Sequence, residues 1–142
     1  MKKLITIFIL ILGVTSCSSD DEVKINNSDI VGKWNWFSTD GGIGYHIHEN
    51  PESTGKEIEL NLRQNYSYSI KENGTEISNG TYELSMRDSN YSTEQERFIT
   101  CSGNYQNQNV VLSGIIRVIN IDTLTISDNY DDGIGSGFKK SE

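Results

Sequence analysis

Two histidines supply the only spacing in this sequence that resembles a metal site. His46 and His48 lie two residues apart, so on a β-strand both imidazoles would point to one face, where zinc or copper could bind. Glu49 follows directly but would point the other way. Residues 41–55 are rich in glycine and predict a long loop. Because no third ligand is nearby, solvated loop histidines are the favoured reading, and we expect neither a metal nor another cofactor.

The remaining reactive side chains do not form a catalytic set. Cys101 lies in a strand-like apolar stretch, where a lone thiol is usually a small buried hydrophobe. The acidic run Asp128–Gly133 fails as a calcium loop, because its third position is Tyr130 and the bidentate acid position is Lys139. The sequence contains no Gly-x-Ser-x-Gly motif and no phosphate-binding loop. We therefore predict that the protein is not an enzyme.

Cys17 follows a segment that is typical of a bacterial signal peptide. Two lysines precede residues 4–12, an apolar run that is too short to cross a bilayer as a helix. Residues 14–17, Val-Thr-Ser-Cys, resemble the lipobox of bacterial lipoproteins, in which the cysteine thiol carries diacylglycerol. The resemblance implies a signal peptide over residues 1–16 and a lipid anchor on Cys17. The alternative is an ordinary secretory peptide.

Residues 17–28 are polar and acid-rich, which predicts a flexible tether ahead of a domain spanning residues 29–142. The tether begins with Ser18 to Glu22, a serine-plus-acidic run that resembles the surface-export signal of one group of Gram-negative bacteria. This resemblance implies an outer-membrane lipoprotein at the cell surface. The alternative is a plain linker, which would leave the domain on the periplasmic face.

The charge of the chain excludes one class of partner. The formal net charge is −8, and removal of the two leader lysines makes it −10. Basic residues are scattered, so nucleic acid is not expected as a partner. The same negative charge makes anionic lipid surfaces poor partners, so we expect the acyl chains on Cys17 to hold the protein on the membrane.

Hydrophobic residues of the domain alternate with polar ones, the period of half-buried antiparallel strands. Residues 57–63 and 66–70 show this alternation, and Asn73-Gly74 is a strong signal for a type I′ turn. Further strands are predicted at 76–86, 98–101, 110–119, 122–127 and 135–140, with loops or turns at 87–96, 104–109 and 128–133. Short strands and one proline predict an all-β fold, an antiparallel barrel.

Three motifs resemble lipocalins and small bacterial lipocalin-like domains. They are the Gly-x-Trp of Gly32 and Trp34, the Gly-x-aromatic of residues 80–82, and a closing hairpin that includes residues 124–128. The resemblance implies an up-and-down lipocalin-like β-barrel of about eight strands. It also implies a late basic residue over Trp34, for which Arg117, Lys139 and Lys140 are the candidates.

Such barrels hold ligands at the mouth, so the resemblance also implies a small hydrophobic molecule or a glycan as ligand. The aromatic residues predicted to line or plug the barrel are Trp34, Trp36, Tyr66, Tyr68 and Tyr82. They can equally be core, because eight strands leave room for little more than side chains. The alternative is a filled barrel that binds a protein partner, as an inhibitor or an accessory of an envelope complex.

Replacing Cys17 by serine tests the anchor. Because the hydroxyl cannot replace the thiol as lipid acceptor, we expect the precursor to stay uncleaved by the lipoprotein peptidase and the protein to leave the membrane fraction. Cell fractionation and intact mass measure both effects, and Cys101→Ser is the matched control. A Cys17→Ser variant that is still processed and membrane-bound would contradict the lipobox.

Overall fold

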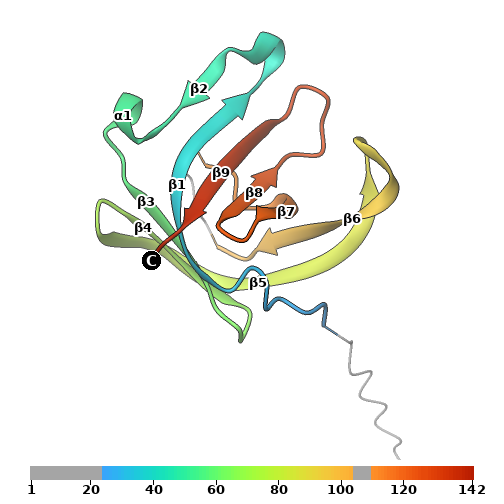
Figure 1. Cartoon of the computed structure of the whole chain (residues 1–142), viewed down its shortest axis with the longest axis horizontal. Helices are drawn as coiled ribbons and strands as arrows, with labels where there is room; N and C mark the ends of the chain where they lie inside the picture. The colour runs from blue at the N-terminus through green and yellow to red at the C-terminus, as the bar shows by residue number, and fades with distance from the viewer. Residues whose placement is uncertain (1–23, 104–109) are drawn as a thin grey trace, which may run out of the picture.

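The computed structural model describes residues 24–103 and 110–142, and Figure 1 shows its β-sheet closed on itself. Cys17 and the predicted turn at 104–109 lie outside the described residues. Among those described, the strands are β1 (Gly32–Gly41), β2 (Ile47–Glu49), β3 (Ile58–Leu62), β4 (Ser67–Glu72), β5 (Thr75–Ser89), β6 (Ser92–Cys101), β7 (Gly114–Asn120), β8 (Thr123–Ser127) and β9 (Ile134–Lys140). A short 3-10 turn, η1 (Ile43–Tyr45), and one helical turn, α1 (Pro51–Thr54), join β1 to β3 around β2.

Neighbouring strands pair in sequence order, except that β1 pairs with both β3 and β9. This last ladder closes eight strands into an antiparallel up-and-down barrel, and β2 is added beside the end of β1. The predicted fold class is confirmed. The predicted turn at Asn73-Gly74 joins β4 to β5, and both residues adopt positive φ angles of 50° and 80°. No helix among the described residues has the length and apolar character to cross a membrane.

Side chains fill the barrel interior. Inward-facing residues from every strand of the barrel form one buried cluster that includes four of the predicted aromatic residues: Trp34, Trp36, Tyr68 and Tyr82. Alternation explains this, since Ile58, Leu60 and Leu62 are buried while the residues between them are only half-buried. The described part of the domain contains one cysteine, which is free, so no disulfide stabilises that part. Burial of this apolar cluster stabilises it instead.

The N-terminal segment plugs one end of the barrel, which we call the tether end. Ile30 is fully buried, and its carbonyl accepts a hydrogen bond of 2.8 Å from the Trp34 indole. Asn27 is also buried and donates to the Tyr82 hydroxyl at 2.7 Å. Lys140 lies over the Trp34 ring, with Nζ 5.4 Å from its centre. Of the three basic residues that were candidates for this contact, it is the one that packs on Trp34. The last part of the expected tether thus packs on the barrel.

The segment between β6 and β7 enters the barrel near the other end. Val110, Val111 and Leu112 belong to the buried cluster. The Val111 amide donates to Ser136 Oγ at 2.8 Å, and Ser136 shares a hydrogen bond of 2.6 Å with Thr39 Oγ1. Thr39 in turn accepts from the Trp36 indole at 2.9 Å. This buried polar chain satisfies groups that would be costly to leave unpaired.

Two predictions about the strand pattern were wrong, one of a loop and one of a strand boundary. Residues 87–96 were predicted as a loop, but they belong to a hairpin in which β5 runs to Ser89 and β6 starts at Ser92. Its side chains are exposed or half-buried on both faces, so no alternation marks it. The strand predicted over 110–119 starts only at Gly114, because Val111 bonds to a side chain in the interior instead of to a ladder.

Replacing Asn27 by alanine tests the plug at the tether end. The change removes a buried amide that bonds to Tyr82 and also reaches the carbonyls of Arg63 and Gln64 at 3.3 Å. We expect the free energy of unfolding, measured in urea, to fall by about 1–3 kcal/mol. Asn120→Ala is the control, because Asn120 is exposed, and we expect a change within about 0.5 kcal/mol. Equal losses in the two variants would contradict a specific role for Asn27.

Candidate functional site

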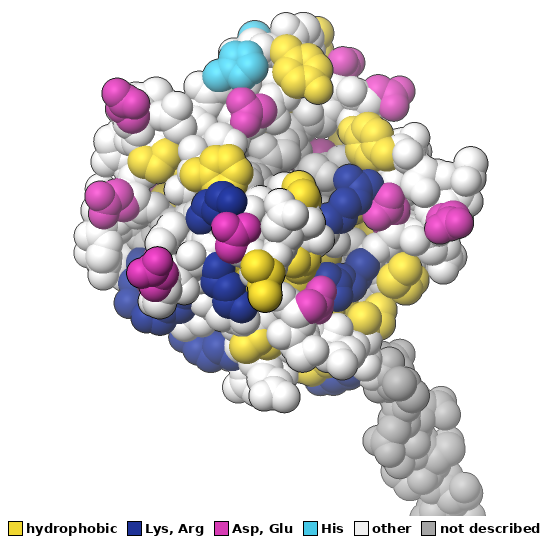
Figure 2. All heavy atoms as spheres, in the orientation of Figure 1, with side chains coloured by type: hydrophobic (Ala, Val, Ile, Leu, Met, Phe, Trp, Pro, Cys, Tyr) yellow, Lys and Arg dark blue, Asp and Glu magenta, His cyan; other side chains and the backbone are white. Residues whose placement is uncertain are grey.

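A groove of about 520 Å³ lies on the outer wall of the barrel, and we call it the outer groove. Its volume is within the range of small-molecule sites, which is roughly 300–1,000 Å³. Strands β1, β7, β8 and β9 contribute its wall, and η1 and the turns at 89–92 and 128–133 stand around it. Figure 2 shows the corresponding face of the molecule, with hydrophobic and acidic side chains around a hollowed centre.

Two glycines of β9 form the floor of the outer groove. Gly135 and Gly137 alternate with the inward-facing Ser136 and Phe138, so no β9 side chain covers the outer surface at these two positions. The Phe37 ring lies directly over Gly137, where a Cβ atom would come within 2.5 Å of it. Phe37 faces outward by alternation with the buried Trp36, and the bulge between Trp36 and Ser38 places Ser38 outward as well, so that Thr39 is the next buried residue.

The segment from Gly41 to Tyr45 makes one rim. A Cβ atom on Gly41 would lie 2.3 Å from the carbonyl oxygen of Gly133, so this close approach of two backbones requires glycine. The Gly42 amide donates to the same oxygen at 3.2 Å. Tyr45 is held with a positive φ of 54° and is 73% exposed, an uncommon conformation that places a large ring in solvent beside the groove.

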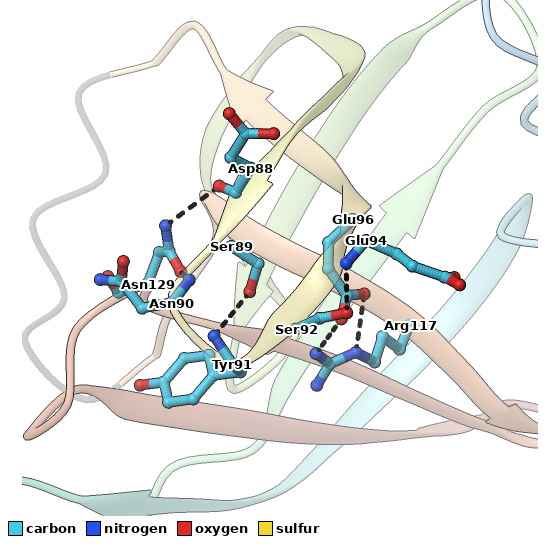
Figure 3. A network of polar contacts seen from close by, with 9 residues as sticks. All are labelled: Asp88, Ser89, Asn90, Tyr91, Ser92, Glu94, Glu96, Arg117 and Asn129. Atoms are coloured by element: carbon cyan, nitrogen blue, oxygen red, sulfur yellow. Dashed lines mark hydrogen bonds and ion pairs between the residues drawn. The ribbon is translucent and has the colours of Figure 1, made fainter.

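The tip of the β5–β6 hairpin makes the opposite rim, and Figure 3 shows how it is fastened. The side-chain oxygen of Asn129 accepts from the Asn90 amide at 2.8 Å, and its nitrogen donates to the Asp88 carbonyl at 3.4 Å. The Asn90 side chain returns a bond of 2.7 Å to the Asn129 carbonyl. Tyr91 donates its hydroxyl to the Tyr130 carbonyl, which sets the Tyr91 ring at the groove.

An ion pair fastens the stem of the same hairpin. Arg117 of β7 makes two bonds to the Glu96 carboxylate of β6, at 2.7 and 3.1 Å (Figure 3). These bonds lower the pKa of Glu96 and raise that of Arg117. The pair matters because β6 and β7 share only two register positions, Phe98 with Ile115 and Ile99 with Gly114.

The outer groove carries mostly negative charge. Asp40, Asp128, Asp131 and Asp132 line it, whereas Arg117 is the one cation among its described lining residues and is already paired. His48 Nδ1 lies 3.0 Å from Asp40 Oδ1, and this hydrogen bond lowers the pKa of Asp40. Carboxylates of this kind accept hydrogen bonds from ligand hydroxyl or amine groups.

The five aromatic residues predicted to line or plug the barrel differ in how far they are buried. Trp34, Tyr68 and Tyr82 are at most 1% exposed, and Trp36 is nearly as buried while touching an open surface depression. Tyr66 is half-buried and packs against Tyr82 with ring centres 5.5 Å apart. Tyr66 and Tyr82 border a smaller pocket of about 300 Å³ at the tether end, together with Lys24 and Ile25.

The other reactive candidates do not combine into a site. His46 Nδ1 contacts the Ile43 carbonyl at 2.7 Å while His48 contacts Asp40, and residues 24–103 and 110–142 hold no group of three metal-ligating side chains. Cys101 donates to the Leu112 carbonyl at 3.3 Å, and burial raises the pKa of its thiol to about 12. This thiol is therefore protonated at neutral pH.

Sequence reasoning missed the residues that define the outer groove. Phe37, Tyr45 and Tyr91 come from three distant segments, and none of them sits in a motif. One usable signal was present, since Gly135 and Gly137 are two residues apart and so leave one face of a strand bare. We compared the chain with models of protein families, curated proteins and solved structures, and none of the three comparisons gave a match. Function must therefore be inferred from the groove itself.

Replacing Asn129 by alanine tests whether this side chain holds the hairpin rim. Loss of a bond of about 1 kcal/mol should speed hydrogen exchange of the Asn90 amide about fivefold. Exchange measured by NMR or mass spectrometry reports this, while the barrel amides should be unaffected. Asn79→Ala is the control, because its side chain bonds only to the exposed Glu76. An unchanged exchange rate at Asn90 would contradict the fastening.

Proposed function

We propose that this protein is a non-enzymatic lipoprotein, anchored through Cys17 and exposed at the surface of the outer membrane, that binds a glycan in the outer groove. The observation that supports this most directly is the set of three exposed aromatic rings, Phe37, Tyr45 and Tyr91, around a glycine floor, with the Phe37 ring packed on Gly137. Flat apolar rings pack against the C–H faces of sugars, and neighbouring carboxylates accept bonds from sugar hydroxyls.

The position of the groove suits recognition outside the cell. By the up-and-down connectivity, β1 starts at the tether end and finishes at Gly41, beside the outer groove. The turn at 128–133 belongs to the same far end. A lipid on Cys17 would therefore hold the tether end near the membrane and leave the rim at residues 41–45 and the turn at 128–133 directed away from it.

The filled interior favours the outer wall over the barrel mouth as the ligand site. A small hydrophobic molecule inside the barrel would have to displace Trp34, Tyr68 and their neighbours, which are already packed. Displacement of such side chains forfeits several kcal/mol of burial. The protonated Cys101 supports a non-enzymatic role, because a nucleophilic cysteine acts as its thiolate.

A second candidate function is protein binding at the same face. Ile119 lines the groove and Ile43 belongs to the η1 segment that carries Tyr45, and they are 60% and 76% exposed. Aliphatic side chains offer little to a sugar ring but are typical of a contact that excludes water between proteins. The partner would then be a protein at the cell envelope, and the groove would be only part of the contact.

Aromatic variants test the glycan proposal. Full-length mature protein in mild detergent is applied to an oligosaccharide array, and the best binder is titrated by calorimetry. We expect Tyr45→Ala and Tyr91→Ala each to weaken binding about tenfold, which is about 1.4 kcal/mol. Met86→Ala is the control, because Met86 is as exposed as Tyr91 but lies outside the groove lining.

Two results would decide against the glycan. The first is the absence of any oligosaccharide that binds the unmodified protein. The second is binding that survives both tyrosine variants, which would place the glycan elsewhere. If Ile43→Asn abolishes binding of an envelope protein while the tyrosine variants do not, the second candidate function is the correct one.

A further inference from the structure

The tether end of the barrel brings together four parts of the chain. β1 starts there, β3 and β9 end there, and the turn between β7 and β8 lies beside them. The Lys140 amide donates to the Asp122 carbonyl at 2.9 Å, which ties this turn to the last residues of the chain. The Ser141 amide donates to the Lys33 carbonyl at 2.8 Å. The surface so formed is continuous with the point at which the N-terminal segment joins the barrel.

This end exposes three lysines although the protein is acidic, and the exposed Glu142 lies there too without an ion pair in the described part of the chain. Lys24, Lys33 and Lys140 are exposed there, and they form no ion pair with any residue in the described part of the chain. The nearby acids Asp29 and Asp122 are paired, with Arg97 at 2.7 Å and Lys139 at 3.2 Å. In Figure 2 the Lys and Arg side chains lie over the middle and lower part of the face, with several acids among them, while the upper rim carries acids and histidine.

An isoleucine stands at the tip of the β7–β8 turn in the same region. Ile121 is 89% exposed, the highest value among the large hydrophobic side chains of the described residues. It directly precedes Asp122, whose backbone bonds to Lys140. An exposed apolar tip next to unpaired lysines matches the chemistry of a lipid interface, where the apolar group enters and the cations meet headgroup phosphates.

We propose that the tether end is a second membrane contact, in which the unpaired lysines bind anionic phospholipid headgroups and Ile121 enters the interface. The proposal rests on the lipid anchor at Cys17 that forms part of the proposed function. Lys24 follows Cys17 by seven positions in the sequence, and a chain of that length reaches at most about 25 Å. The basic end is therefore held close to the anchoring leaflet, and a weak contact suffices because tethering makes it intramolecular.

This contact gives the barrel a defined orientation. With the tether end on the lipid, the rim at residues 41–45 and the turn at 128–133 stand at the opposite end of the barrel, while Ile119, which also lines the groove, lies near the tether end. The overall negative charge also contributes, because the acids of the far end are repelled by the same headgroups that attract the lysines. A tether without such a contact would let the barrel rotate freely above the membrane.

A fluorescent label at position 121 tests the contact. Full-length lipidated Ile121→Cys protein is labelled with an environment-sensitive dye and reconstituted in phosphatidylethanolamine vesicles containing phosphatidylglycerol and a lipid-borne quencher. Both labelled proteins also carry Cys101→Ser, because Cys101 is only half-buried and would otherwise compete for the dye. We expect blue-shifted emission and at least twofold stronger quenching than for a label at Tyr130→Cys, which lies at the far end.

Charge variants make the test specific. Lys24→Gln with Lys33→Gln should reduce the quenching at position 121 at least twofold, and so should omission of phosphatidylglycerol or addition of salt. Lys56→Gln with Lys71→Gln is the matched control, because it removes the same charge at the other end, where both lysines pair with glutamates. We expect this control to leave the quenching unchanged.

The outcomes separate the two proposals. Flotation of the vesicles is measured first, and a protein that fails to float in every variant contradicts the lipid anchor. A protein that floats but shows equal quenching at positions 121 and 130 overturns the membrane contact alone. Quenching at 121 that responds equally to both pairs of lysine variants also overturns it, because the contact would then not depend on the tether end.

Discussion

The ladder between β1 and β9 is the pairing on which the rest of the molecule depends. It converts an open sheet into a barrel, so that both strands lose their free edges and the apolar side chains of eight strands face one interior. The same ladder carries a bulge beside Phe37, whose ring faces outward, and the glycines of β9 lie opposite Ser38 and Asp40. Closure of the barrel and construction of the outer groove are thus two results of one strand pairing.

The small size of the barrel decides where a ligand can bind. Eight strands enclose only enough space for side chains, and here the N-terminal segment and the segment at 110–112 add to that filling. A ligand site therefore has to be built on the outside. The wall of this site has no side chains at Gly135 and Gly137. Part of its rim consists of the β5–β6 hairpin and the 128–133 turn, which the hydrogen bonds between Asn90 and Asn129 hold together.

The two ends of the barrel differ in charge and in connection. Free lysines and an exposed isoleucine lie at the end that joins the tether, while carboxylates gather at the other end beside the aromatic rings. A net charge of −8 conceals this division, because it adds both ends together. The two groups of charges lie apart because successive strands run in opposite directions, which places successive turns at opposite ends of the barrel.

The sequence by itself determined most of the strand pattern, the turn at Asn73-Gly74 and the inward position of Trp34, but neither the hairpin at 87–96 nor the start of β7, because it reports only local alternation and local backbone preference. It also supplied the basis for the anchor prediction at Cys17. Only the tertiary structure decided that the interior is filled and that Phe37, Tyr45 and Tyr91 meet around one groove. The physical reason is that alternation tells only whether a side chain points into or out of the sheet. Barrel closure and strand register determine which distant segments then lie side by side around the groove.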